Sequence, residues 1–200
     1  MDRRRAIKNI ALGAAGLLVP PALFADQKCV PLTPYVNRCS AGITSEKLQE
    51  QFVYQQQTEW CWAACISMIF GYWGHPISQM RIVKETWGVL TNMPGSPQQV
   101  IADLNRAWVD DRGRAFKSQT HMTNNTVAIT DLQNNCPSII GALGHAMVLT
   151  AVTWDGNATT GAWQIDEVVV RDPWPGNGSR RVLTLAEWMN IAFAAGVEVF

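Results

Sequence analysis

The hydrophobic positions in the first half of the chain follow the spacing of helices. Residues 61–72 (CWAACISMIFGY) are apolar on nearly every face, with Gly71 and Gly74 as stop signals, and they predict a buried central helix. Ahead of this segment, residues 44–52 (TSEKLQEQF) predict a short helix, whereas residues 26–43 show no regular period and predict an irregular arm. The first half therefore predicts a helical unit built around residues 61–72.

Two more helices are expected after the central one. The segment PISQMRIVKETWG predicts a helix that begins near Pro76 or Ser78 and ends at Gly88. The next helix has a clear start, because Ser96 is a favoured N-cap and Pro97 suits the first helical position. Its pattern continues through the segment QQVIADLNRAW.

The pattern changes to that of strands after Trp108. The segments that predict strands are RAFKSQ, CPSIIGAL, HAMVLTAVTW, AWQIDEVVVRD and the last four residues, VEVF. Between them, TVAITDLQNN predicts a short helix, and RRVLTLAEWMNIAFAAG predicts a short strand followed by a helix. A helical half followed by an antiparallel β half is an α+β arrangement, in which an active site can lie in the cleft between the halves.

The first 25 residues have the layout of an export signal. A basic start is followed by an apolar run from Ile10 to Val19 and by a small residue, Ala25, where cleavage can occur. The run is shorter than the roughly 20 residues of a membrane-spanning helix, so we expect no stable membrane anchor. Residues 3–8 (RRRAIK) also resemble a twin-arginine motif that lacks its usual aromatic residue. The sequence thus predicts an exported protein, either periplasmic or secreted.

Composition and charge narrow the functional classes. Hydrophobic residues make up 48% of the chain, enough to fill the core of one domain, which we place at residues 55–200 after an arm at 26–54. Without residues 1–25, the chain keeps 12 Lys+Arg against 15 Asp+Glu, a net charge of −3, which argues against nucleic acid as a partner. Because no Cys-x-x-Cys pair, His-x-x-x-His pair or phosphate-binding loop occurs, we expect no metal or nucleotide cofactor.

The chain has an odd number of cysteines. Exported proteins favour disulfides, and a cysteine left over is a candidate reactive thiol. Cys29 and Cys39 bracket a short Pro-containing loop that a local disulfide would cross-link. Cys65 and Cys136 would form a second, long-range disulfide, or else Cys65 would be a buried free thiol of the central helix. In either case Cys61 is left as a candidate reactive thiol.

Cys61 stands at the start of the central helix, where a thiol can act as a nucleophile. Attack requires the thiolate, which a helix N-terminus favours through its positive potential and unpaired N–H groups. A neighbouring base is also required. Of the three histidines, His75 and His121 fall in polar segments, whereas His145 opens an apolar strand whose end can face a cleft. Cys61 and His145 are therefore the candidate nucleophile and base.

Two further residue types would complete this candidate site. Asp172 ends a later apolar strand, and a neighbouring antiparallel strand can bring its carboxylate to His145 to orient the imidazole. Gln55, with Gln56 as a reserve if the register shifts by one, precedes Cys61 and would join the Cys61 N–H in an oxyanion hole. On composition alone, the same residues also fit an ordinary turn and a polar loop.

Taken together, these segments resemble a known family. Gln55 lies six positions before Cys61 in Q-x5-CWAA, which is similar to the active-site segment of papain-like (clan CA) cysteine peptidases. GHAMVLTAV resembles the His strand of that family, and VVVRDPWPG resembles its Asp/Asn strand. The likeness runs from Gln55 to Phe200 and is greatest to the compact bacterial branch, with staphopain-like proteases and the papain-like effector proteases of plant pathogens. It implies a papain-like fold, with a buried central helix packed on an antiparallel β half.

The resemblance also implies roles for the site residues and an activity. Cys61 would be the nucleophile, His145 the general base and acid, Asp172 its orienting residue and Gln55 the oxyanion donor. The expected activity is hydrolysis of peptide bonds in protein or peptide substrates, without a cofactor. Two alternatives stay open: a peptidoglycan amidase, peptidase or acyl transferase that uses the same thiol, and an inactive papain-fold protein that binds a partner.

Overall fold

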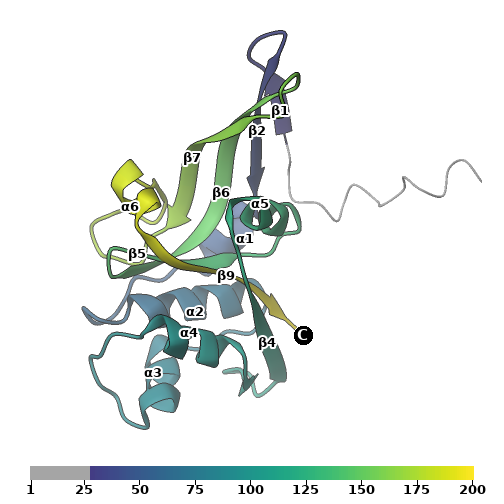
Figure 1. Ribbon diagram of the computed structural model, residues 1–200. Coiled ribbons are helices and arrows are strands. Elements are labelled where there is room, and N and C mark those ends of the chain that lie inside the picture. Colours follow the sequence, from purple (N-terminus) through teal and green to yellow (C-terminus); the bar gives the residue numbers. More distant parts are fainter. Residues whose placement is uncertain (1–27) are drawn as a thin grey trace, which may run out of the picture.

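The computed structural model describes residues 28–200, so the predicted export signal lies outside the described residues. Its helices are α1 (Ser45–Glu50), α2 (Cys61–Tyr72), α3 (Gln79–Trp87), α4 (Pro97–Leu104), α5 (Asn125–Gln133) and α6 (Leu185–Met189). Its strands are β1 (Lys28–Pro31), β2 (Val36–Gly42), β3 (Ala107–Val109), β4 (Ala115–Met122), β5 (Ser138–Ala142), β6 (His145–Asn157), β7 (Trp163–Arg171), β8 (Arg181–Val182) and β9 (Ile191–Val199). Helices α2, α3 and α4 lie together on one side of the antiparallel sheet (Figure 1), which confirms the predicted α+β class.

Strand β6 organises the sheet. Along one edge its first residues pair with β5 and its later residues with β2, while β7 pairs along the other edge. The strand order is β1-β2-β6-β5-β9-β4-β3, with β8 beside β7, and every pairing is antiparallel. Because β6 begins with His145, the residue that starts the longest strand is also a candidate site residue.

Helix α2 forms the centre of the core. Apart from Cys61 and Ser67, every residue of this helix is buried, and it packs against β6 and α3. A helix that is covered all round has apolar residues on all its faces, which explains the sequence of this segment. Each fully buried large side chain contributes about 1.5–3 kcal/mol, so the helix and the cysteine at its start are held firmly. None of the helices in residues 28–200 is long and apolar enough to cross a membrane.

Helices α3 and α4 begin where the sequence predicted. Ser78 caps α3 by accepting a hydrogen bond from the Arg81 N–H, and Gly88 ends it in the left-handed region with φ of 73°. Ser96 caps α4 in the same way, with Pro97 at its first position. The predicted continuation of α4 to residue 108 is wrong, because residues 107–109 leave the helix and pair with β4.

The arm at residues 26–43 was expected to be irregular, and this prediction is wrong for its described part. Strands β1 and β2 form a hairpin, and β2 continues the sheet beside the end of β6. Cys29 and Cys39 lie directly opposite each other in this hairpin and form a disulfide, as predicted. The second partner of β2, strand β6, lies more than 100 residues away in the chain, so no local pattern could indicate that the hairpin joins this sheet.

Two other predictions about the second half also need correction. The helix predicted within residues 180–196 ends at Met189, and β9 begins at Ile191, well before the expected strand at 197–200. Strand β9 pairs with both β4 and β5, which fixes it as a strand through long-range contacts.

The long-range disulfide does not form, because Cys65 and Cys136 are both free and buried. Burial raises the pKa of the Cys65 thiol well above its ordinary value. Burial, with the nearby Asp131 charge adding to it, raises the pKa of Cys136 to about 12. Both residues are therefore buried thiols, the alternative expected for Cys65.

Candidate active site

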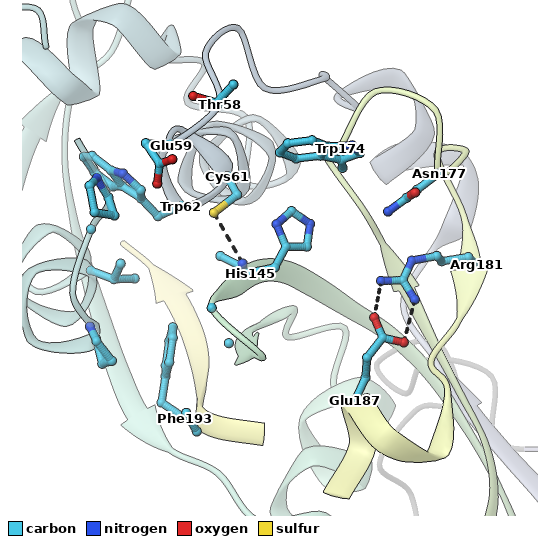
Figure 2. A pocket seen from close by; sticks show the side chains of 18 residues that line it. Thr58, Glu59, Cys61, Trp62, His145, Trp174, Asn177, Arg181, Glu187 and Phe193 are labelled. Atoms are coloured by element: carbon cyan, nitrogen blue, oxygen red, sulfur yellow. Dashed lines mark hydrogen bonds and ion pairs between the residues drawn. The ribbon is translucent and has the colours of Figure 1, made fainter. Parts of the chain in front are cut away.

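Cys61 and His145, which are far apart in the chain, line the same cavity of about 530 Å³. Cys61 is half-buried at the first position of α2 (Figure 2). The backbone N–H of Ala146 donates to Cys61 Sγ at 3.4 Å, so the start of β6 lies directly against the thiol. Residues from the helical part and from the sheet both line this cavity, as expected for a cleft between the two halves.

A tight turn sets the position of His145. Ala142 of β5 pairs with His145 of β6, which leaves Leu143 and Gly144 as a two-residue hairpin turn. Both turn residues have positive φ, 51° and 80°, the arrangement of a type I′ turn. Glycine suits this turn, and the imidazole follows it immediately.

Asp172 and His145 lie within hydrogen-bond distance, as the sequence predicted. His145 Nε2 is 2.7 Å from Asp172 Oδ1, and the carboxylate is fully buried. An ionised carboxylate only accepts, so Nε2 donates to Asp172 and Nδ1 is left for the side of Cys61. In Figure 2 the His145 ring stands between Cys61 and Trp174, whose ring centroid is 6.2 Å away.

The Asp172 carboxylate has three donors besides the imidazole. The Trp174 N–H donates to Oδ1 at 2.9 Å, while Asn177 Nδ2 and Arg181 Nε donate to Oδ2 at 2.9 and 2.6 Å. Burial opposes ionisation of this carboxyl, but the hydrogen bonds outweigh it and hold its pKa well below the usual range. Asp172 is therefore a fixed negative charge behind His145.

Arg181 links this carboxylate to helix α6. Its two terminal nitrogens form a bidentate pair with Glu187, at 2.6 and 2.9 Å, while its Nε binds Asp172. Glu187 in turn forms a capping box with Thr184 at the start of α6. The sequence alone did not indicate Arg181, Glu187 or the role of Asn177. The capping box could be read from its spacing, but its link to Asp172 could not.

The charges around His145 favour its protonated form. Burial lowers the pKa of the imidazole, but the Asp172 hydrogen bond and the Cys61 sulfur outweigh this effect and raise the pKa to about 9. His145 therefore carries a proton at neutral pH, beside a thiol at a helix N-terminus. This arrangement can hold a thiolate and an imidazolium as an ion pair.

The structure does not bring the Gln55 amide to Cys61. Gln55 is buried, and its Nε2 donates to the carbonyls of Gln57 and Thr58 at 2.9 and 2.8 Å. Its Oε1 is buried and has no partner within residues 28–200. Gln55 lines a neighbouring cavity of about 270 Å³ and is not in the wall of the larger one. Its role as an oxyanion donor stays a prediction.

Gln56, the reserve for that role, is exposed. Its backbone N–H donates to Oε1 of the buried Gln79, whose Nε2 donates to the Tyr54 carbonyl. These bonds hold the loop that leads into α2.

The other two histidines lie elsewhere. His75 pairs with Asp110 and His121 pairs with Asp131, and neither lines the cavity beside Cys61. Within residues 28–200, no group of three or more His, Cys, Asp or Glu side chains could hold a metal ion.

Comparison with known proteins identifies the family. Residues 48–195 match the model of the Peptidase_C39 like family. No curated protein matches the chain. Among solved structures, the chain is similar to the peptidase domain of Streptococcus ComA, a bi-functional ABC transporter involved in a quorum sensing pathway. The identity is 15% and the TM-score 0.51, over 74% of this chain and 96% of that one. It also matches UfSP from C. elegans, with 11% identity and a TM-score of 0.45, over 79% of this chain and 33% of that one.

The first of these structures shows that the chain has the papain-like cysteine peptidase fold. The expected likeness to staphopain-like and plant-pathogen effector proteases stays a prediction. The family and the fold together imply a cysteine peptidase. Because the family match spans most of the chain, this protein belongs to the Peptidase_C39-like family.

Proposed function

We propose that the protein is an exported cysteine peptidase in which Cys61, His145 and Asp172 hydrolyse peptide bonds. The observation that carries this proposal is the 2.7 Å contact between His145 and Asp172, made beside a half-buried thiol at the start of a helix. The family match supports a peptidase activity, and the cavity beside the thiol gives a substrate access to it.

The reaction begins with attack of the Cys61 thiolate on the carbonyl carbon of the scissile bond, while the carbonyl π electrons move to oxygen. His145 then donates its Nδ1 proton to the leaving nitrogen as the C–N bond breaks. The products of this step are a free amine and a thioester on Cys61.

Water completes the reaction. His145, now neutral, accepts a proton from the attacking water, and the C–S bond of the second tetrahedral intermediate breaks. The acid product leaves, and the Cys61 thiolate and the His145 imidazolium are restored.

The oxyanion needs donors at the start of α2. No side chain from the described part of the chain caps this helix, so the Cys61 N–H is one proposed donor. Gln55 would be the second, after its amide turns away from the carbonyls of Gln57 and Thr58. Removal of one such donor typically lowers kcat by about 10²–10³-fold.

The test is labelling of the purified protein with E-64, an epoxide that traps papain-type thiolates, followed by mass spectrometry. We expect a rapid single adduct at Cys61, none in Cys61→Ala, and none at the buried Cys65 and Cys136. A mixed peptide library should be cleaved by the wild type and not by Cys61→Ala. Labelling without cleavage would favour an acyl transferase, and the absence of labelling would favour an inactive binding protein.

Export by residues 1–25 is part of the proposal. The disulfide between Cys29 and Cys39 supports it, because structural disulfides persist in oxidising compartments. We expect protein recovered from outside the cytoplasm to begin near residue 26, as measured by intact mass. Recovery of the full chain from the cytoplasm alone would contradict export.

A further inference from the structure

The hairpin of β1 and β2 and the hairpin of β6 and β7 end side by side, and both project away from helices α2, α3 and α4 (Figure 1). The Ala158 N–H in the second hairpin donates to the Tyr35 carbonyl in the first, at 2.9 Å. We call residues 29–37 and 156–163 together the hairpin tip. This tip is a part of the surface that the proposed peptidase chemistry does not use.

The hairpin tip carries large exposed side chains and no charge. Leu32, Tyr35 and Trp163 are 49%, 63% and 44% exposed. Neither segment of the tip contains Asp, Glu, Lys or Arg. Tyr and Trp side chains have an apolar body and a polar end, and they gather where a bilayer meets water. The composition of the tip is therefore that of a surface that inserts at such a boundary.

The backbone of the first loop of the tip (residues 32–35) satisfies its own hydrogen bonds. The Thr33 hydroxyl accepts from the N–H groups of Tyr35 and Val36, at 3.2 and 3.0 Å. The Val36 carbonyl accepts from those of Leu32 and Thr33, at 2.8 and 3.1 Å. The remaining loop residue is a proline, which has no N–H group. Every N–H group of this loop therefore has a partner within the protein.

The second loop of the tip (residues 158–162) is satisfied in the same way. Asn157 accepts from three of its N–H groups, two at the side-chain oxygen and one at the carbonyl, at 2.9 to 3.0 Å. The Thr160 hydroxyl accepts from the Ala162 N–H at 3.3 Å, and the Ala158 N–H binds the first loop. In water, solvent can bind the N–H groups of a loop, whereas a loop in a bilayer must satisfy them internally. Both loops meet this requirement.

We propose that the hairpin tip docks on a zwitterionic phospholipid bilayer, with Leu32, Tyr35 and Trp163 inserted at the boundary between headgroups and acyl chains. A protein partner fits less well, because a stable interface covers about 800 Å² on each partner. The strands behind the tip carry ion pairs instead of an apolar face, such as Arg38 with Asp155. The docking is reversible, because three side chains bury far less apolar surface than a membrane-spanning helix.

Docking at the tip keeps the cleft away from the bilayer. His145 starts β6 beside Cys61, and Asn157 ends the same strand at the tip, 13 residues in all. A strand of that length spans about 40 Å. Substrate in the surrounding water can therefore still enter the cleft when the tip is docked.

Flotation of the purified protein with phosphatidylcholine vesicles tests the proposal. We expect part of the wild type to float with the vesicles, in a fraction that rises with lipid concentration. Because the tip is uncharged, the bound fraction should be equal in 0.1 and 0.5 M salt and should not rise when phosphatidylglycerol is added. Binding only to the anionic vesicles would show adsorption by charge and would overturn the proposal.

A double variant at the tip assigns the binding to its side chains. Leu32→Ser with Tyr35→Ser should lower the partition constant about tenfold, because apolar groups are removed from the inserted part. The matched control is Leu90→Ser with Tyr54→Ser. These two residues are exposed to a similar extent, 52% and 47%, and lie outside the tip. The control should float like the wild type.

Tryptophan fluorescence locates the inserted part. Brominated phosphatidylcholine should quench the fluorescence of the wild type, because bromine atoms on the acyl chains quench only nearby indoles. Trp163→Phe should lose most of this quenching and keep most of the flotation. Quenching that is unchanged in Trp163→Phe would place another part of the surface at the bilayer and would overturn the proposal.

Two further results would overturn the inference. One is the absence of flotation at every lipid concentration, or equal flotation of the wild type and the tip variant. The other is self-association without lipid that the tip variant abolishes, because the tip would then bind a second copy of the chain. Cys61→Ala should float like the wild type, so the inference and the proposed peptidase function can fail independently.

Discussion

The same three residue types gather at two places in this molecule, and their surroundings differ. The cleft group is Cys61, His145 and Asp172, and the strand group is Cys136, His121 and Asp131. Both have a short contact from His Nε2 to Asp Oδ1, 2.7 Å in the cleft group and 2.9 Å in the strand group. A His–Asp distance alone therefore does not mark an active site.

The two carboxylates differ in their partners. Asp172 accepts from four groups, which together hold its pKa well below the usual range despite burial. The buried Oδ2 of Asp131 has no hydrogen-bond partner among the described residues, and burial raises the pKa of Asp131 although His121 opposes this. Of these two carboxylates, Asp172 has more donors to stabilise its charge, and it is the one that orients the imidazole beside Cys61.

The two thiols differ in their access to substrate. Cys61 is half-buried at a helix start and lines a cavity. Cys136 is buried, donates to the Val197 carbonyl at 3.4 Å and has a pKa raised to about 12 by burial. A thiol with that pKa stays protonated at neutral pH, so Cys136 is no nucleophile. The cleft group therefore differs from the strand group in two ways. Its carboxylate accepts more hydrogen bonds, and its thiol is accessible from a cavity.

Substitution of the two thiols should give the largest contrast. Cys61→Ala should lower peptide hydrolysis by at least about 10³-fold, because the covalent step is lost. Cys136→Ala should keep hydrolysis within about twofold and cost about 1 kcal/mol in the free energy of unfolding. Initial rates and denaturant unfolding measure both. Equal losses of activity would remove the distinction between the groups.

Substitution of the two carboxylates, Asp172 and Asp131, should give the next largest contrast in activity. Asp172→Asn should lower kcat by about 10²–10⁴-fold, because an amide neither fixes the tautomer of His145 nor stabilises its positive charge. Asp131→Asn should leave kcat unchanged. Steady-state kinetics on protein with native circular dichroism checks this, and a comparable loss in Asp131→Asn would contradict it.

The pH dependence should report His145. Its pKa of about 9 lies above the ordinary value, so the stability that its protonated form contributes is fully present below about pH 6.5 and is lost as pH rises through about 9. Hydrolysis should fall over the same alkaline range, because the leaving amine then lacks its proton donor. Asp172→Asn should move this fall to lower pH. A wild-type fall centred near pH 6.5 would contradict the ion pair.

Arg181→Gln should leave the Asp172 carboxylate with fewer hydrogen-bond donors, so that it resembles Asp131 in this respect. The change removes one donor and leaves Glu187 without its bidentate partner. Since three donors to Asp172 remain, we expect a fall in kcat of about tenfold, with a lower melting temperature. Arg181→Lys, which keeps the charge, should recover part of the loss. An unchanged kcat in Arg181→Gln would show that Arg181 does not position Asp172.

The smallest effect on activity should come from damage to the strand group. A Cβ at Gly196 would lie 2.6 Å from Asp131 Oδ2 and would meet the His121 ring. Gly196→Ala should therefore break that pair and cost about 1–3 kcal/mol in unfolding free energy, with unchanged labelling of Cys61 per folded molecule. Loss of labelling in folded protein would show that the two groups are coupled.

Local signals made part of the fold predictable. The boundaries of α2 and α3 follow from apolar periodicity, the Ser78 cap and the positive φ of Gly88, all of which act within a few residues. The disulfide of Cys29 with Cys39 was also predictable, because the loop between them is short. The pairing of β2 with β6 and the start of β9 at Ile191 were not predictable, because these ladders join segments distant in sequence.

The candidate site was likewise predictable only in part. Cys61, His145 and Asp172 were singled out by their places at the ends of elements and by a family resemblance. The structure places Cys61 and His145 in one cleft and Asp172 buried behind His145. His121 was set aside as a polar-loop residue, yet it too has a short contact with an aspartate. The pair of His145 and Asp172 stands beside an accessible thiol because β6 packs against α2.

By itself, the sequence determined the helix that presents Cys61, the caps and turns around it, and the residue types available for thiol chemistry. Only the tertiary structure decided that Arg181 and Glu187 hold Asp172 and that Gln55 turns its amide to its own loop. The reason is physical. Helix periodicity, caps and turns depend on interactions between near neighbours in the chain. The pKa of His145 and the partners of each carboxylate depend on groups that only the packed sheet and helices bring together.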